Sequence, residues 1–202
     1  IKNIQINQVL KHPNWNMGKK ISVDSSTMMN KVFEIIEAKN IFNISYKKLM
    51  ILIHPSSYVH TLIKFKNGII KIVAHDTDMK IPILNTLEID FKKKIKTNKI
   101  NISKLNDLRL EKIDIKKFPL TKILSILPQK SSLFETVIVS ANDELVKLFL
   151  NNKIKFTDIS KKLLLILKKK EFNKYKRIVP KNISQIIKLN KYVRLKINPK
   201  SI

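Results

Sequence analysis

Residues 12–34 read HPNWNMGKKISVDSSTMMNKVFE, and this stretch decides how the rest of the chain is interpreted. Pro13 and Gly18 bracket Trp15, a combination typical of a mobile loop that closes over a site. Residues 21–24 alternate apolar and polar side chains, as a half-buried strand does. Apolar residues at 28, 29, 32, 33, 35 and 36 then have the spacing of an amphipathic helix that ends near Asn43. The stretch therefore predicts a loop, a short strand and the beginning of a helix.

The beginning of this predicted helix suits an anion. Ser25, Ser26 and Thr27 offer hydroxyl groups of the kind that cap helices, and Lys31 lies within the first turn. A helix N-terminus carries free N–H groups and a partial positive charge, which favour a phosphate. Asn30 and Glu34 are four residues apart and so share one helical face, beside Lys31. Taken alone, the local pattern favours the alternative of a capped amphipathic helix whose polar face is only solvated.

The composition limits the possible functions. The chain has 41 basic and 15 acidic residues among 202, a formal net charge of +26, which favours a polyanionic partner. Only three of the basic residues are arginines, whereas base readout relies heavily on arginine. The lysines are spread along the chain together with many Ile and Asn residues, as an A/T-rich coding sequence produces. A lysine-rich nucleic-acid-binding protein is therefore the less favoured alternative.

Several classes of protein are excluded by what the sequence lacks. Without cysteine there is no disulfide or thiolate chemistry, which is compatible with a cytoplasmic location. No run of 18 apolar residues predicts a membrane span. With only two glycines, the chain cannot contain a GxGxxG dinucleotide motif or a phosphate-binding P-loop. The first residue is not Met and no signal-peptide layout follows it, so we expect a truncated form of a longer protein.

The remaining patterns predict an α+β protein. Apolar residues 49–53 suit a buried strand, and residues 57–65 and 69–74 suit two strands joined by the hairpin signal Asn67-Gly68. Helical patterns follow at 120–127 and at 132–150. A third helical pattern begins after Thr157-Asp158, and a fourth covers 182–196. We expect a mixed α/β catalytic domain with a β-hairpin sheet (1–84), a lysine-rich linker with a short strand at 108–113 (85–118), and a C-terminal helical bundle (119–202).

Several segments resemble one enzyme family. The stretch HPNWNMGKKISVDSSTMMNK is similar to the substrate-loop and phosphate-site segment of 1-deoxy-D-xylulose 5-phosphate reductoisomerases. LIHPSSYVH at 52–60 and Asp78-Met79 with Pro82 resemble two further segments of that family. SANDE at 140–144 and IKFTDI at 154–159 resemble its helix and the loop after it. The resemblance covers about residues 10–160.

The resemblance implies an activity and a set of site residues. It implies NADPH-dependent conversion of 1-deoxy-D-xylulose 5-phosphate to 2-C-methyl-D-erythritol 4-phosphate, in non-mevalonate isoprenoid biosynthesis, with Mg²⁺ or Mn²⁺. The residues at the matching positions are His12, Trp15 and His54 as catalytic, Ser25, Asn30, Lys31 and Glu34 as substrate-binding, Gly18 and Met79 near the cofactor, and Glu34 as metal ligand. The partners implied are a phosphorylated sugar substrate and a second copy of the chain in a homodimer.

The resemblance also indicates missing parts. The family's other metal ligands come from an Asp-Ser-Glu segment that does not occur here, and its N-terminal NADPH domain is absent. We therefore expect these 202 residues to bind substrate weakly at best and not to turn it over alone. The alternative is a degenerate remnant without activity. Asn142 and Asp143 are expected to tie the helical part to the catalytic part by hydrogen bonds.

Overall fold

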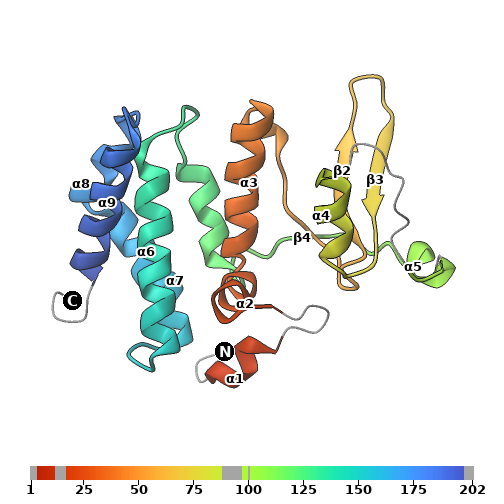
Figure 1. Cartoon of the computed structure of the whole chain (residues 1–202), viewed down its shortest axis with the longest axis horizontal. Coiled ribbons are helices and arrows are strands. Elements are labelled where there is room, and N and C mark those ends of the chain that lie inside the picture. The colour runs from red at the N-terminus through yellow and green to blue at the C-terminus, as the bar shows by residue number, and fades with distance from the viewer. Residues whose placement is uncertain (1–3, 12–16, 88–96, 100, 198–202) are drawn as a thin grey trace. The chain divides into compact units, whose positions relative to one another are not determined.

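The computed structural model describes residues 4–11, 17–87, 97–99 and 101–197. This part of the chain is mostly helical, with two small two-stranded antiparallel sheets (Figure 1). It divides into two compact units, one containing residues 17–51 and 114–197, the other residues 52–113. These two units do not coincide with the predicted domains (1–84, 85–118 and 119–202). The domain boundaries therefore stay a prediction.

The first unit is helical. Helix α6 lies between α9 on one side and the helical segment η2 on the other, with α3 next to η2 (Figure 1). Its elements are α1 (Ile6–Leu10), α2 (Lys19–Ser26), α3 (Met29–Phe42), η1 (Tyr46–Lys48), η2 (Pro119–Ile126), α6 (Leu133–Leu150), α7 (Phe156–Lys168), α8 (Lys170–Asn173), η3 (Lys174–Arg177) and α9 (Ile183–Ile197).

Helix α6 forms the core of this unit because its apolar side chains cover most of its circumference. Phe134, Val137, Ile138, Ala141 and Leu145 are each 0% exposed. A helix that is apolar on several faces needs neighbours on several sides, and α7, α9 and α2 provide them. The predicted helix at 132–150 is thus confirmed.

A capping box starts α6 at the predicted position. The Ser132 hydroxyl accepts a hydrogen bond from the Phe134 N–H (3.2 Å), and the Glu135 carboxylate accepts one from the Ser132 N–H (3.1 Å). The pattern Ser-x-x-Glu before an apolar run is the sequence signature of this motif. Burial raises the pKa of Glu135, although the Ser132 N–H and the charge of Lys39 oppose this.

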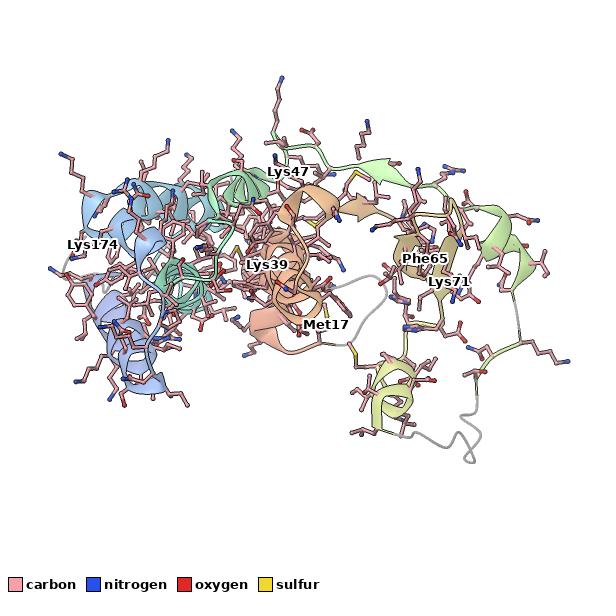
Figure 2. All side chains as sticks on the ribbon, turned by 90° about the horizontal axis from the view of Figure 1, so that it is seen from above. Met17, Lys39, Lys47, Phe65, Lys71 and Lys174 are labelled. Carbon is pink, nitrogen blue, oxygen red and sulfur yellow. The ribbon has the colours of Figure 1, made fainter. Side chains whose placement is uncertain are left out.

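Lysines account for much of the surface of the helical unit. Lys47 and Lys174 carry exposed side chains, whereas Lys39 lies among the helices and is 8% exposed (Figure 2). The Lys39 ammonium donates to the Ser131 hydroxyl (3.1 Å) and to the Asn40 side-chain oxygen (3.2 Å). Buried lysines are rare, and these contacts replace the water that Lys39 loses.

The second unit contains a hairpin and two short helices. Strands β2 (Val59–Lys64) and β3 (Ile70–Ala74) pair antiparallel, with Lys64 opposite Ile70 and a bulge between Val59 and Thr61. Gly68 has φ +88°, which a side chain would disfavour, so the predicted Asn67-Gly68 turn is confirmed. The other elements of this unit are β1 (Leu52–Ile53), α4 (Lys80–Leu87), α5 (Ile102–Asn106) and β4 (Glu111–Lys112), and β1 pairs with β4.

One local prediction is wrong: residues 21–24 form part of helix α2 and not a strand. Four residues of alternation are too few to exclude a helix. Ser22, Val23 and Asp24 are all buried in succession, which a strand with one solvated face does not allow.

The hydroxyl groups of residues 25–27 do not cap the following helix. Ser26 and Thr27 donate to carbonyl oxygens of Ser22 and Val23, four residues earlier. These bonds belong to α2, because small hydroxyl side chains often bond back to the preceding turn. Met28, with φ +61° in the left-handed region, separates α2 from α3.

Several predicted element lengths also change. Strand β1 is confined to Leu52–Ile53, the two residues that pair with β4, and not 49–53 as predicted. The segment predicted as a helix at 120–127 is a 3-10 helix, Pro119–Ile126.

Candidate active site

Three polar side chains at the beginning of α3 contact one another. The Asn30 side-chain amide donates to one Glu34 oxygen (2.6 Å), and the Lys31 ammonium donates to the other (2.7 Å). Lys31 and Glu34 are both 45% exposed. The predicted common face is therefore real, and its charged groups point to solvent, where a ligand can reach them.

The N-terminus of α3 has no side-chain cap. Met28 occupies the N-cap position and offers no side-chain oxygen to the first N–H groups of the helix. These groups are usually satisfied by a cap, by water or by a ligand. Ser25, half-buried in the last turn of α2, is close in sequence to this uncapped end. Residues 25–31 thus carry a hydroxyl, an amide, an ammonium and the first backbone N–H groups of α3.

Helix α2 is held against α6 by a buried hydrogen bond. The Asn142 amide donates to Asp24 (2.8 Å), and the two side chains lie 118 residues apart in sequence, with Asn142 0% and Asp24 2% exposed. Lys20 contacts Asp24 (2.8 Å) and Asp143 (3.0 Å) as well. Burial lowers the pKa of Lys20, but the hydrogen bonds and charges of the two carboxylates outweigh burial and raise the pKa overall. The predicted tie through Asn142 and Asp143 is present.

Two parts of the chain match profiles of known protein domains. A profile for the 1-deoxy-D-xylulose 5-phosphate reductoisomerase C-terminal domain matches residues 1–42, and one for the DXP reductoisomerase C-terminal domain matches residues 75–196, more than half of the chain. The chain belongs to the 1-deoxy-D-xylulose 5-phosphate reductoisomerase family.

Relatives of the reductoisomerase family match along the whole chain. The 1-deoxy-D-xylulose 5-phosphate reductoisomerase of Pelagibacter ubique is 59% identical over 201 residues, which are 100% of this chain and 52% of the relative. A crystal structure of DOX-P reductoisomerase in complex with NADPH, fosmidomycin and magnesium has a TM-score of 0.87 at 29% identity, covering 99% of this chain and 50% of that one. The Zymomonas mobilis enzyme in complex with NADPH has a TM-score of 0.79 at 28% identity, covering 98% and 50%. The chain thus spans about half the length of these reductoisomerases.

Not every predicted site residue can be placed beside α3. His12 and Trp15 lie outside the described residues. Gly18 is the N-cap residue of α2 and is exposed. His54 and Met79 belong to the other compact unit, where a ring nitrogen of His54 contacts the Arg109 carbonyl oxygen (3.1 Å) and Met79 is 50% exposed. The roles of these five residues stay predictions.

The described residues do not form a complete metal site. Among them no three His, Asp or Glu side chains lie together as metal ligands. Magnesium prefers about six oxygen ligands, whereas the α3 cluster supplies the single carboxylate of Glu34.

No helix in the described part of the chain is long and apolar enough to cross a membrane.

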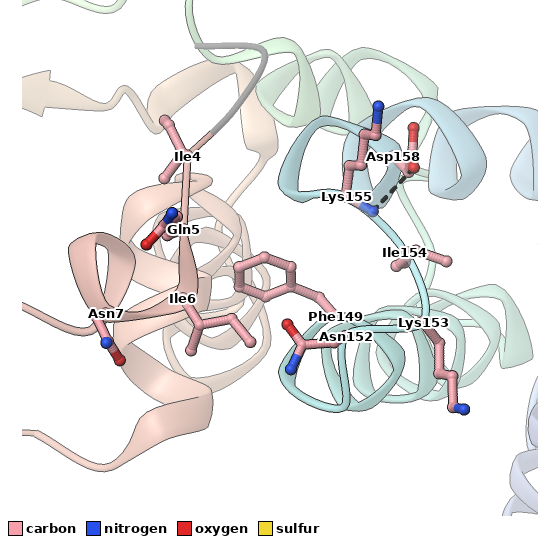
Figure 3. Close-up of a pocket in the computed structure, with 10 residues that line it drawn as sticks. All are labelled: Ile4, Gln5, Ile6, Asn7, Phe149, Asn152, Lys153, Ile154, Lys155 and Asp158. Atoms are coloured by element: carbon pink, nitrogen blue, oxygen red, sulfur yellow. Dashed lines mark hydrogen bonds between the residues drawn. The ribbon is translucent and has the colours of Figure 1, made fainter.

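The cavities described here lie in the helical unit, and their lining includes none of the predicted site residues. The larger, about 830 Å³, lies between the start of α1 and the α6–α7 corner, with the Phe149 ring between Ile4 and Asn152 (Figure 3). The smaller, about 490 Å³, is lined by Lys39, Ser131 and their neighbours. The charged groups of the candidate site lie on an exposed face of α3, since Lys31 and Glu34 are each 45% exposed.

Sequence reasoning missed two residues around the site. Lys20 bridges two carboxylates, and its four-residue spacing from Asp24 was a usable local signal. Arg194 on α9 donates to Asp143 (2.7 Å), and no local pattern connects these two residues.

Proposed function

We propose that this chain is the substrate-binding and C-terminal portion of a 1-deoxy-D-xylulose 5-phosphate reductoisomerase. In the complete enzyme it serves the NADPH-dependent conversion of 1-deoxy-D-xylulose 5-phosphate to 2-C-methyl-D-erythritol 4-phosphate. Membership in the family supports this proposal, and so does the similarity to a solved relative whose complex contains NADPH, fosmidomycin and magnesium. We also propose that two copies of the chain associate as a homodimer, as the resemblance to the family implies.

The observation that carries the proposal is the set of donors around the uncapped start of α3. Asn30 and Lys31 supply an amide and an ammonium, and Ser25 supplies a hydroxyl. Charge-assisted hydrogen bonds to a phosphate are about twice as strong as neutral ones, and the helix end adds favourable backbone dipoles. The substrate's phosphate binds at these groups.

Glu34 has two roles in this proposal. Without a ligand it accepts hydrogen bonds from Asn30 and Lys31 and keeps both side chains on one face. With substrate bound, Lys31 turns to the phosphate, and the Glu34 carboxylate is released to face a divalent cation or a substrate hydroxyl. The remaining cation ligands and the main NADPH site lie outside these 202 residues.

We also propose roles for further positions that match functional residues of the family. His12, Trp15 and His54 are catalytic residues, and Gly18 and Met79 are cofactor-binding residues.

A chimera tests the proposed function. The 202 residues replace the corresponding half of the Pelagibacter ubique relative, with which they share 59% identity. We expect the chimera to oxidise NADPH when 1-deoxy-D-xylulose 5-phosphate and Mn²⁺ are present, and the chain alone to give no oxidation above a control without protein. The unaltered relative is the positive control, and circular dichroism checks that the chimera is folded. A folded chimera without turnover contradicts the proposal.

A further inference from the structure

A continuous series of polar contacts connects the C-terminal helix with helix α2. Arg194 on α9 donates to one Asp143 oxygen (2.7 Å), and Lys20 on α2 contacts the other (3.0 Å). Lys20 also contacts Asp24 (2.8 Å), the residue before Ser25. Positive and negative groups alternate along this series, so each charge is stabilised by the opposite charges next to it.

Arg194 is held in place from the other side as well. Its Nε donates to the Asn190 side-chain oxygen (2.9 Å), and the Asn190 amide donates to the Ser140 hydroxyl (2.8 Å). Ser140 is 0% exposed and donates in turn to the Thr136 carbonyl oxygen. The guanidinium group therefore has a defined direction, and Asp143 is fixed by a rigid partner.

The carboxylates in this series need their partners. Asp24 is 2% exposed, and the side chain of Asp143 is 21% exposed. A charge withdrawn from water is costly unless it is paired and hydrogen-bonded, so loss of one partner changes the arrangement of the others. Loss of Arg194 leaves Asp143 paired with Lys20, which also serves the more deeply buried Asp24.

We propose that Arg194 is a positioning residue for the phosphate site, acting through Asp143 and Lys20 to hold α2, whose last turn carries Ser25, next to the start of α3. The inference rests on the proposed function, because it concerns the same phosphate site. It assigns a role to the C-terminal helix, which contributes no group of its own to that site.

Substitutions of Arg194 in the whole 202-residue chain test this role. The affinity for 1-deoxy-D-xylulose 5-phosphate is measured by NMR titration, following the amide signals of Ser25 and Asn30. A small misplacement of a binding group costs up to about a hundredfold in catalysis, so we expect Arg194→Met to weaken binding about three- to tenfold. The signal of Ser25 should respond to the ligand less than in the unaltered chain.

Three further variants sharpen the test. Lys191→Met removes one positive charge from an exposed position of the same helix and should leave the affinity unchanged. Arg194→Lys keeps a cation and should restore part of the affinity. Asn190→Ala loosens Arg194 without a change of charge and should weaken binding in the same direction. All titrations are done well below the unfolding midpoint of each variant, so that a loss of stability alone does not change the result.

The outcomes are distinguishable. If the unaltered chain alone does not bind the substrate, the same variants are compared by their KM in the chimera, where an unaltered chimera without turnover removes the phosphate site and this inference with it. If the unaltered chain binds and Arg194→Met behaves like Lys191→Met, the phosphate site stands and the positioning role is overturned.

Discussion

The substitution Asn142→Ala tests how strongly the α2–α6 hydrogen bond stabilises the helical unit. Asn142 is fully buried, and its amide donates to the Asp24 carboxylate at 2.8 Å. A hydrogen bond to a charged group contributes about 1.5–3 kcal/mol, and the space left by the amide group costs about 1 kcal/mol more. The Asn142 oxygen, buried without a hydrogen-bond partner, disappears in the variant, which offsets about 1 kcal/mol.

The expected loss in the free energy of unfolding is therefore about 1.5–3 kcal/mol. Urea unfolding followed by circular dichroism measures it from the midpoint and slope. Asn173→Ala, at an exposed position in α8, is the matched control and should change stability by less than about 0.5 kcal/mol. If Asn142→Ala loses no more than this control, the hydrogen bond does not hold α2 against α6 and the reasoning is refuted.

Three further predictions concern the core, an ionisable group and the α3 cluster. Phe134→Ala should lower the free energy of unfolding by about 3–5 kcal/mol, because the ring is 0% exposed; a loss below about 1 kcal/mol in urea unfolding would contradict the packing described for α6. Burial, together with the charge of Glu135, raises the pKa of Tyr46 to about 12 from 10.0. The folded protein therefore keeps this proton while the unfolded chain loses it, so stability should fall between pH 10 and pH 12, and Tyr46→Phe should reduce that fall; equal slopes for both proteins would show that Tyr46 is not the cause. Glu34→Gln should change stability by less than about 0.5 kcal/mol, since the carboxylate is exposed, yet weaken Mn²⁺ binding by the chimera in a paramagnetic resonance titration; unchanged Mn²⁺ affinity would exclude Glu34 as a ligand.

Elements defined by short-range signals could be predicted from the sequence. The Asn67-Gly68 hairpin, the Ser-x-x-Glu start of α6 and the end of α3 at Phe42 are of this kind. Each depends on residues within one turn, so no knowledge of the tertiary structure is needed.

Features set by tertiary contacts could not be predicted in this way. Residues 21–24 alternate as a strand does, yet tertiary packing buries Ser22, Val23 and Asp24 together, which a helix packed on several sides allows and a half-solvated strand does not. The partner of Asp24 is 118 residues away, and the series from Arg194 to Lys20 joins three helices. No spacing within one helix reveals such contacts, because they depend on how the helices pack.

The candidate site could be predicted only in part from the sequence, for the same reason. The common face of Asn30, Lys31 and Glu34 follows from helical spacing and is present. The sequence does not predict the uncapped start of α3, because its hydroxyl groups at 25–27 suit an N-cap of α3, whereas those of Ser26 and Thr27 bond within α2. This difference strengthens the proposed phosphate site, since the helix N–H groups are left to a ligand.

The most direct test of the central claim is the KM of the chimera for 1-deoxy-D-xylulose 5-phosphate after loss of Lys31. Lys31→Met is compared with Lys47→Met, which removes the same charge from an exposed position in the same unit. If Lys31 binds the substrate's phosphate, its substitution should raise KM at least about tenfold, as loss of a charge-assisted contact of about 1.5–3 kcal/mol predicts, while Lys47→Met leaves KM unchanged. Equal KM values for the two variants would contradict a phosphate site at the start of α3.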